Sequence, residues 1–241
     1  IIMNKEEFIR EVEKLGIKVT KKNLEQLEIY CEYLLEYNKH TNLTAIKTKE
    51  EVYLKHFYDS LALCKVIDLT KEESLLDIGS GAGFPGMVLK IFFTNLKVYL
   101  VDSNNKKTKF LEELKIKLNV NNLEVINNRI EKLYDLFLNK IDIVTARAVT
   151  NLTILSELAI PIVKKDKYFI AMKGNATEEI NESRYAINYL NCQIETIDNF
   201  ELFNNFGHRT IIKIKKIKES ERKSIRSYDK IIKKPLQKRN K

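Results

Sequence analysis

A short apolar segment followed by a cluster of glycines offers the clearest chemistry in this sequence. Residues 75–86 read LLDIGSGAGFPG, an apolar run that ends in Asp77. Four glycines then fall within eight residues: Gly79, Gly81, Gly83 and Gly86. Glycine has no Cβ, so the backbone turns tightly and approaches a ligand closely. Open α/β sheets bind ligands beyond the carboxyl ends of their strands. The pattern therefore predicts a strand that ends at a small-molecule site.

Two ligands suit such a turn. Residues 81–86 match the G-x-G-x-x-G pattern of dinucleotide sites. A pyrophosphate is disfavoured because Asp77 is negative and because Pro85 lacks the amide N–H that a phosphate would use. S-adenosyl-L-methionine carries a positively charged sulfonium and ammonium, which a carboxylate such as Asp77 would attract. Asp102 ends the next apolar run, where acids accept hydrogen bonds from ribose hydroxyls. We favour S-adenosylmethionine over a dinucleotide, and a turn without any ligand is the third possibility.

The elements that must position these residues follow from the spacing of apolar side chains. From residue 72 onwards, short apolar runs alternate with longer amphipathic stretches. This alternation predicts an α/β fold with a mostly parallel sheet and helices on both faces. The strands are expected at 74–78, 97–101, 123–127, 141–146, 168–172, 193–198 and 209–217. The helices are expected at 85–93, 105–118, 130–138, 151–163 and 176–190.

Residues 4–68 have helical spacing instead. An apolar stripe runs from Leu24 to Tyr37, a further helix is expected over 52–66, and the polar segment 38–44 between them is expected to be a loop. The expected organisation is an N-terminal helical region (1–68), an α/β ligand-binding domain (69–218) and a basic C-terminal tail (219–241).

Basic residues are concentrated at the C-terminus. Between Arg209 and Lys241 there are 14 Lys and Arg against 3 Asp and Glu, whereas residues 1–208 hold 28 basic and 30 acidic side chains. A basic tail on a nearly neutral body is typical of proteins that bind a polyanion such as RNA. A solubilising end without a partner is the alternative, and an acidic membrane is less suitable because the tail lacks a large apolar face.

Other features narrow the class of protein. The three cysteines and three histidines are scattered without metal-ligand spacing. No apolar window approaches the length of a membrane span, and no signal peptide is expected. We expect a reduced, cytoplasmic, metal-free protein that acts as a monomer.

Smaller motifs follow the expected strands. Ile130 and Glu131 come after the third strand, where an adenine contact is possible but a core residue and a helix cap are favoured. Arg147 follows the fourth strand, and a place beside the ligand or on the solvated surface is equally compatible with its position. His56 and Asp59 lie on nearby helical positions, either as a structural pair or as part of a substrate-facing rim.

Taken together, these segments closely resemble the bacterial RsmG (GidB) family, over nearly the whole chain. The most specific segments are Gly83-Phe84-Pro85-Gly86 and Ala146-Arg147-Ala148-Val149. The wider resemblance is carried by Tyr37-Asn38, Asn42-Leu43-Thr44-Ala45, His56, Asp59-Ser60-Leu61, residues 77–86, Val101-Asp102-Ser103, Lys106-Lys107, Phe110-Leu111, Arg129-Ile130-Glu131, residues 145–149, Lys173-Gly174, His208-Arg209 and Lys234-Pro235-Leu236. Three positions depart from the family pattern: Tyr37 replaces a tryptophan, residues 165–167 replace a glycine-containing turn, and Ile225 replaces a proline before Arg226.

The resemblance implies a class I S-adenosylmethionine-dependent methyltransferase fold with a Rossmann-like, mostly parallel seven-stranded sheet. It implies methylation of guanine N7 in the 530-loop region of 16S rRNA of the small ribosomal subunit. Arg147 would lie between cofactor and RNA and is the expected catalytic residue. The expected cofactor-binding residues are Asp77, Gly79, Gly81, Gly83, Phe84, Gly86, Asp102, Ile130, Glu131 and Arg147. The expected RNA-binding residues are His56, Lys106, Arg129, Arg209 and Arg226.

This chemistry would need no general base, because guanine N7 has a free lone pair and no proton at neutral pH. N7 can attack the methyl carbon in line with the departing sulfur, and the protein has to hold the two in near-attack geometry. Two alternatives stay open. One is a class I methyltransferase that acts on a protein or on another RNA site. The other is an RNA-binding assembly factor with a vestigial methyltransferase fold.

Overall fold

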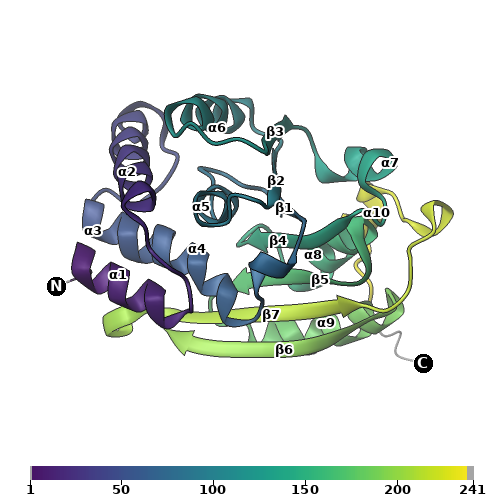
Figure 1. The fold of residues 1–241 in the computed structure, drawn as a ribbon. Coiled ribbons are helices and arrows are strands. Elements are labelled where there is room, and N and C mark those ends of the chain that lie inside the picture. The colour runs from purple at the N-terminus through teal and green to yellow at the C-terminus, as the bar shows by residue number, and fades with distance from the viewer. Residues whose placement is uncertain (1, 238–241) are drawn as a thin grey trace.

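A twisted seven-stranded sheet forms the centre of the computed structural model, which describes residues 2–237 (Figure 1). The strand order is β3-β2-β1-β4-β5-β7-β6. The first five strands pair in parallel, and β7 is antiparallel to both β5 and β6. The expected mostly parallel sheet is therefore confirmed. The strands are β1 Ser74–Ile78, β2 Lys97–Asp102, β3 Leu123–Asn127, β4 Ile141–Arg147, β5 Val163–Lys173, β6 Cys192–Glu201 and β7 His208–Lys216.

Helices cover both faces of this sheet. They are α1 Lys5–Lys14, α2 Lys21–Thr41, α3 Lys49–Val52, α4 Asp59–Leu61, α5 Gly86–Phe92, α6 Asn105–Lys117, α7 Tyr134–Phe137, α8 Leu152–Ala159, α9 Thr177–Tyr189 and α10 Tyr228–Lys233. None of the helices within residues 2–237 is both long and apolar enough to cross a bilayer.

Three local predictions were wrong in part. The segment 38–44 was expected to be a loop, but α2 continues through Thr41 and ends where Asn42 takes a left-handed conformation with φ of 51°. The expected single helix over 52–66 is a π-helical turn, Tyr53–Tyr58, followed by α4 and a 3₁₀ turn. The fifth strand begins at Val163 instead of residue 168, and Asp166 in its first half has a φ of 64°.

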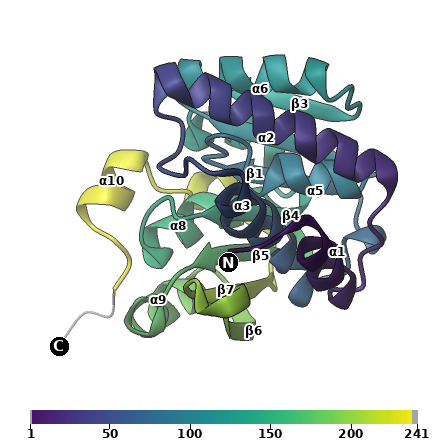
Figure 2. The same cartoon turned by 90° about the vertical axis from the view of Figure 1, so that its left-hand side faces the viewer.

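Alternate side chains of the central strands enter two separate cores, because successive residues of a strand point to opposite faces. Leu75, Val98 and Ile143 belong to the core that the N-terminal helices share with α5 and α6. Leu76 and Val144 belong to the second core, on the side of α7, α8 and α9. Figure 2 shows α2 running alongside α6 over the first face. The N-terminal helices therefore contribute directly to the hydrophobic core of the sheet.

The glycine-rich segment between β1 and α5 is packed from two sides. Gly83 has a φ of 101°, and a Cβ there would lie 2.4 Å from the Tyr30 hydroxyl of α2, which itself donates a 2.5 Å hydrogen bond to the carbonyl of Ala82. A Cβ on Gly86 would lie 2.3 Å from Leu100 Cδ2 and 2.8 Å from an oxygen of Asp77. These positions need glycine because neighbouring atoms already occupy the space of a side chain.

We expect Gly86→Ala to destabilise the protein by about 1–3 kcal/mol, because the added methyl must displace Leu100 and the Asp77 carboxylate in a packed core. Urea unfolding followed by far-ultraviolet circular dichroism measures the change. Gly174→Ala is the matched control, since its Cβ would find no atom closer than 4.0 Å. Equal urea midpoints of unfolding for the two variants would show that the N-terminus of α5 accommodates the added methyl group without loss of stability.

Candidate active site

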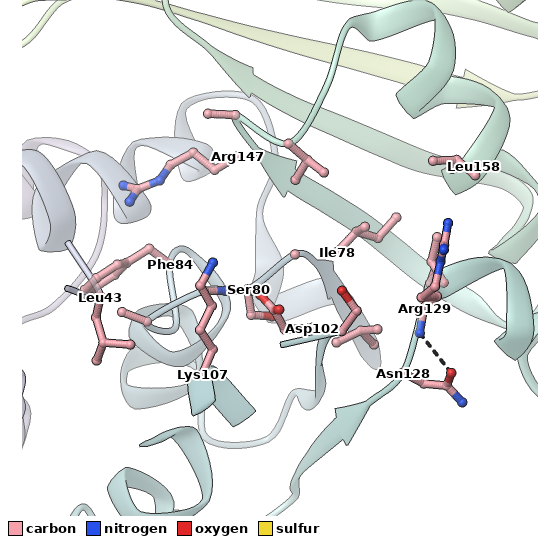
Figure 3. A pocket seen from close by; sticks show the side chains of 18 of the residues that line it. Leu43, Ile78, Ser80, Phe84, Asp102, Lys107, Asn128, Arg129, Arg147 and Leu158 are labelled. Atoms are coloured by element: carbon pink, nitrogen blue, oxygen red, sulfur yellow. Dashed lines mark hydrogen bonds between the residues drawn. The ribbon is translucent and has the colours of Figure 1, made fainter. Parts of the chain in front are cut away.

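The predicted ligand site corresponds to a cavity of about 720 Å³ at the carboxyl ends of β1, β2 and β4 (Figure 3). This volume lies in the range of small-molecule sites. Several residues expected at the cofactor or the RNA line it: His56, Gly79, Gly81, Phe84, Asp102, Arg129, Ile130, Glu131 and Arg147. Figure 3 places Arg147 and Phe84 at one end, Arg129 and Leu158 at the other, and Ser80 and Asp102 between them. We call the first end the inner end and the second the outer end.

Asp102 fastens the glycine-rich turn to the end of β2. One carboxylate oxygen accepts the Gly81 N–H at 2.9 Å, and the other accepts the Asn104 N–H at 2.8 Å. Only 8% of Asp102 is exposed, and the exposed part faces the cavity that it lines. Each carboxylate oxygen has a further lone pair, so Asp102 can still accept a hydroxyl from a ligand while it holds the turn.

Asp77 lies behind the cavity wall and blocks the use of α5 as an anion site. Its carboxylate accepts the Gly86 N–H at 2.9 Å, the first amide of α5. A phosphate would need these amides at the helix N-terminus, so the arrangement disfavours a dinucleotide. The second oxygen, Oδ1, has no hydrogen-bond partner within residues 2–237. Burial raises the pKa of Asp77 from its ordinary 3.8 to about 7, although the Gly86 N–H and Arg147 oppose the rise.

Arg147 defines the inner end. Its guanidinium donates to the carbonyl oxygen of Lys55 at 3.2 Å and to Nδ1 of His56 at 3.1 Å, and lies 3.6 Å from Asp59. It also sits over the ring of Phe84, 5.2 Å from the centroid. His56 and Asp59 therefore do not bond to each other but both hold Arg147. Lys55 and His56 belong to the π-helical turn and Asp59 begins α4, whereas Arg147 ends β4, 91 residues from His56.

His56 is stacked on Phe84, with ring centroids 4.1 Å apart and planes 11° apart, and the Tyr30 ring is also parallel to Phe84, with centroids 5.4 Å apart. Burial, together with the charge of Arg147, lowers the pKa of His56 from 6.5 to about 3. His56 is therefore neutral at physiological pH. It serves as an acceptor for Arg147 and as a flat wall of the cavity.

The outer end combines apolar residues with an ion pair. Leu158 lies at this end (Figure 3), and Ile130, which follows Arg129, also lines the cavity. Glu131 pairs with Arg129 at 2.6 Å, and the Arg129 guanidinium lies 3.9 Å from the ring centroid of Tyr228 in α10. The first part of the tail thus folds back and closes this end, while residues 238–241 lie outside the described part of the chain.

Six of the predicted site residues do not line this cavity. Asp77, Gly83 and Gly86 support the turn from behind. Lys106 is exposed on α6. Arg209 bonds to Asp59 at 2.9 Å and lines a smaller adjoining cavity. Arg226 is held by both oxygens of Glu157 in α8.

Three residues that were not among the predicted site residues also line the cavity: Thr44, Lys107 and Tyr228. Lys107 reaches toward the cavity from the first turn of α6 (Figure 3). The sequence could have indicated Lys107, because it follows Lys106 directly in the same helix and consecutive helical residues point in different directions. Tyr228 gave no such signal, since only the folding back of the tail brings it here.

Known proteins resemble this chain over most of its length. Residues 23–211 match the family model described as rRNA small subunit methyltransferase G. The chain belongs to this family. A protein from Bacillus licheniformis named ribosomal RNA small subunit methyltransferase G is 44% identical over 225 residues, covering 92% of this chain and 94% of the relative. A protein of the same name from Lachnoclostridium phytofermentans is 43% identical and covers 95% and 96%.

Solved structures confirm the expected methyltransferase fold class. A S-adenosylmethionine-dependent O-methyltransferase from Thermotoga maritima superposes with a TM-score of 0.54 at 15% identity, covering 78% of this chain and 73% of its own. TrmN from Thermus thermophilus superposes with a TM-score of 0.53 at 12% identity, covering 66% and 48%. At these identities the likeness concerns the fold.

We expect the pKa of Asp77 to appear in the pH dependence of stability. The unfolded chain ionises Asp77 near pH 3.8 and the folded protein near 7, so wild type loses stability between these values as pH rises. Asp77→Asn cannot ionise. Its free energy of unfolding should therefore rise relative to wild type by about 2–3 kcal/mol between pH 5 and 8.

Urea unfolding at several pH values measures this difference. Asp229→Asn, which changes an exposed acid of α10, should run parallel to wild type. If Asp77→Asn also ran parallel, Asp77 would be ionised throughout this range.

Proposed function

We propose that this protein transfers a methyl group from S-adenosyl-L-methionine to N7 of a guanine in the 530-loop region of 16S rRNA of the small ribosomal subunit. The observation that carries the proposal is the two-ended cavity, with Asp102 and apolar residues toward one end and the held guanidinium of Arg147 at the other. Membership of the rRNA small subunit methyltransferase G family supports it. We further propose that the protein acts as a monomer in the cytoplasm, on a subunit that is whole or partly assembled.

S-adenosyl-L-methionine is the cofactor, and the residues of the cavity fit it. The adenosine would lie between Ile130 and the acids Asp102 and Glu131, which can accept the ribose hydroxyls. Gly81 lines the cavity, and a Cβ there would meet only open space up to 3.9 Å, so the missing side chain leaves room for a ligand. The unpaired Oδ1 of buried Asp77 lies behind the cavity wall, and since the pKa of Asp77 is about 7, a cationic group bound in front of it would favour the ionised carboxylate. When bound, the cofactor supplies an electrophilic methyl group on a sulfonium.

The residues at the inner end position the base and move no proton. Guanine N7 has a lone pair and no hydrogen, so its methylation leaves nothing for a base to remove. His56 is neutral, and its Nδ1 is engaged by Arg147. Arg147 presents its guanidinium at the same end, and an arginine plane of this kind can stack on an extruded base. Placement alone can lower a barrier by roughly 7–11 kcal/mol.

The RNA would approach across the basic surface around the cavity mouth. Lys106 is exposed on α6, Arg129 is partly exposed at the outer end, and Arg209 lies beside Arg147 through Asp59. Arg226, paired with Glu157, anchors the tail that carries the exposed lysines of α10. We propose that these cations, with His56 at the inner end, contact the RNA, and that they do so without a metal ion.

Methyl transfer from labelled S-adenosylmethionine tests the proposal directly. Small ribosomal subunits from a strain that lacks this protein should gain label in 7-methylguanosine at a single site, mapped by nuclease digestion and nucleoside analysis. Label in another nucleoside or in a ribosomal protein would contradict the proposed substrate. Cofactor binding without any transfer would leave the methyltransferase fold standing and reopen the substrate, whereas absence of cofactor binding would favour the assembly-factor alternative.

We expect Arg147→Ala to lower kcat/KM for this transfer at least about a hundredfold, because a misplaced base loses near-attack geometry. The fold should persist, as judged by circular dichroism and by retained binding of S-adenosylhomocysteine. Arg184→Ala, on the exposed side of α9, is the control and should transfer normally. Full activity of a folded Arg147→Ala protein would remove Arg147 from its proposed role.

A further inference from the structure

Thr44 occupies a defined place at the inner end of the cavity. It lies in the segment between α2 and α3 and lines the cavity together with Leu43 and His56. The cofactor's adenosine is assigned to the residues around Asp102 and Ile130, so the inner end is left for the methyl group and the base that receives it. A polar side chain here is positioned to touch the acceptor.

The backbone of Thr44 is held by a single side chain. The Asn38 amide oxygen accepts the Thr44 N–H at 2.9 Å, and the Asn38 amide nitrogen donates to the Thr44 carbonyl at 2.8 Å. Asn38 belongs to the last turn of α2, and the left-handed Asn42 turns the chain back toward it. Thr44 therefore has a fixed position although it lies outside any helix or strand.

The hydrogen bonds around Thr44 leave its hydroxyl only one role. A guanidinium has donors and no acceptor, so Nδ1 of His56, which faces Arg147, must carry a lone pair. The ring proton is then on Nε2, which donates to Thr44 Oγ1 at 2.8 Å. The Ile46 N–H donates to the same oxygen at 3.1 Å. Both lone pairs are occupied, and within residues 2–237 the hydroxyl hydrogen has no acceptor.

We infer that Thr44 is a specificity-determining residue that donates its hydroxyl hydrogen to O6 of the target guanine; this inference rests on the proposed function. The exposed edge of guanine presents two acceptors, N7 and O6. N7 must keep its lone pair free for the methyl carbon, so O6 is the atom that can take a donor. Adenine presents an amino donor in the place of O6.

An unconstrained threonine would not distinguish the two bases, because its hydroxyl can donate or accept. Here, Arg147 donates to Nδ1 of His56, so the ring proton is on Nε2. The His56 Nε2–H and the Ile46 N–H then occupy both lone pairs of Thr44 Oγ1, which can accept no further hydrogen bond. The hydroxyl can therefore donate to O6 of guanine, but it cannot accept a hydrogen bond from the amino group of adenine. The same contacts explain why a neutral histidine stands beside an arginine at this end.

The test pairs enzyme variants with modified RNA. The substrate is a small subunit reconstituted with 16S rRNA that carries either guanine or 2-aminopurine at the methylated position; 2-aminopurine keeps N7 and lacks O6. We expect wild type to lose about tenfold in kcat/KM on 2-aminopurine, the size of one hydrogen bond. Thr44→Val should lose about tenfold on guanine and nothing further on 2-aminopurine. Thr44→Ser should restore the preference of wild type.

Two outcomes would overturn the inference. One is an equal loss by Thr44→Val on both RNAs, which would mean that Thr44 supports only the structure. The other is unchanged activity of Thr44→Val on guanine. Thr196→Val, in the edge strand β6, controls for the substitution itself, and binding of S-adenosylhomocysteine confirms that each variant folds. Failure of wild type to methylate the guanine RNA would instead contradict the proposed function.

Discussion

A nearly buried guanidinium joins the N-terminal helices to the sheet of this protein. The side chain of Arg147 is only 20% exposed, and removing such a charge from water costs several kcal/mol unless partners replace the solvent. The Lys55 carbonyl, His56 and the Asp59 carboxylate provide that replacement. All three lie in the π-helical turn or just after it. The turn and the end of β4 are therefore fixed relative to each other, and the inner wall of the cavity follows from this contact.

The position of the cavity follows from the order of the strands. From β1 the chain proceeds outward through β2 to β3, and from β4 it proceeds in the opposite direction through β5. Loops leaving the carboxyl ends of β1 and β4 diverge, which opens a crevice where α/β proteins bind ligands. The N-terminal helices and α10 then close this crevice at its two ends. An open sheet site becomes a cavity whose ends have different chemistry.

The strands and most helices were predictable because their local pattern and their tertiary burial agree. Leu75 and Leu76 each face a different core, so a run of apolar residues indicates a buried parallel strand. Prediction was wrong where a distant contact decides the local geometry. The turn around His56 is π-helical where it meets Arg147, and the end of α2 is held where the Asn38 amide bonds to the backbone of Thr44. Arg147 is 91 residues from His56, and the Asn38–Thr44 contact, although it spans six residues, joins the end of a helix to the segment after it and follows no helical spacing.

In the candidate site, too, some features follow from local sequence and others only from contacts formed in the folded chain. The sequence by itself determined the sheet, the glycine-rich turn and the acids at two strand ends, because each depends on residues that are adjacent or regularly spaced. Only the tertiary structure decided that Asp77 caps α5, that Tyr228 closes the outer end and that Thr44 can donate but not accept. The direction of a hydrogen bond depends on what every neighbour donates or accepts. That information exists only once the chain has folded and brought Arg147, His56 and Thr44 into one line of contacts.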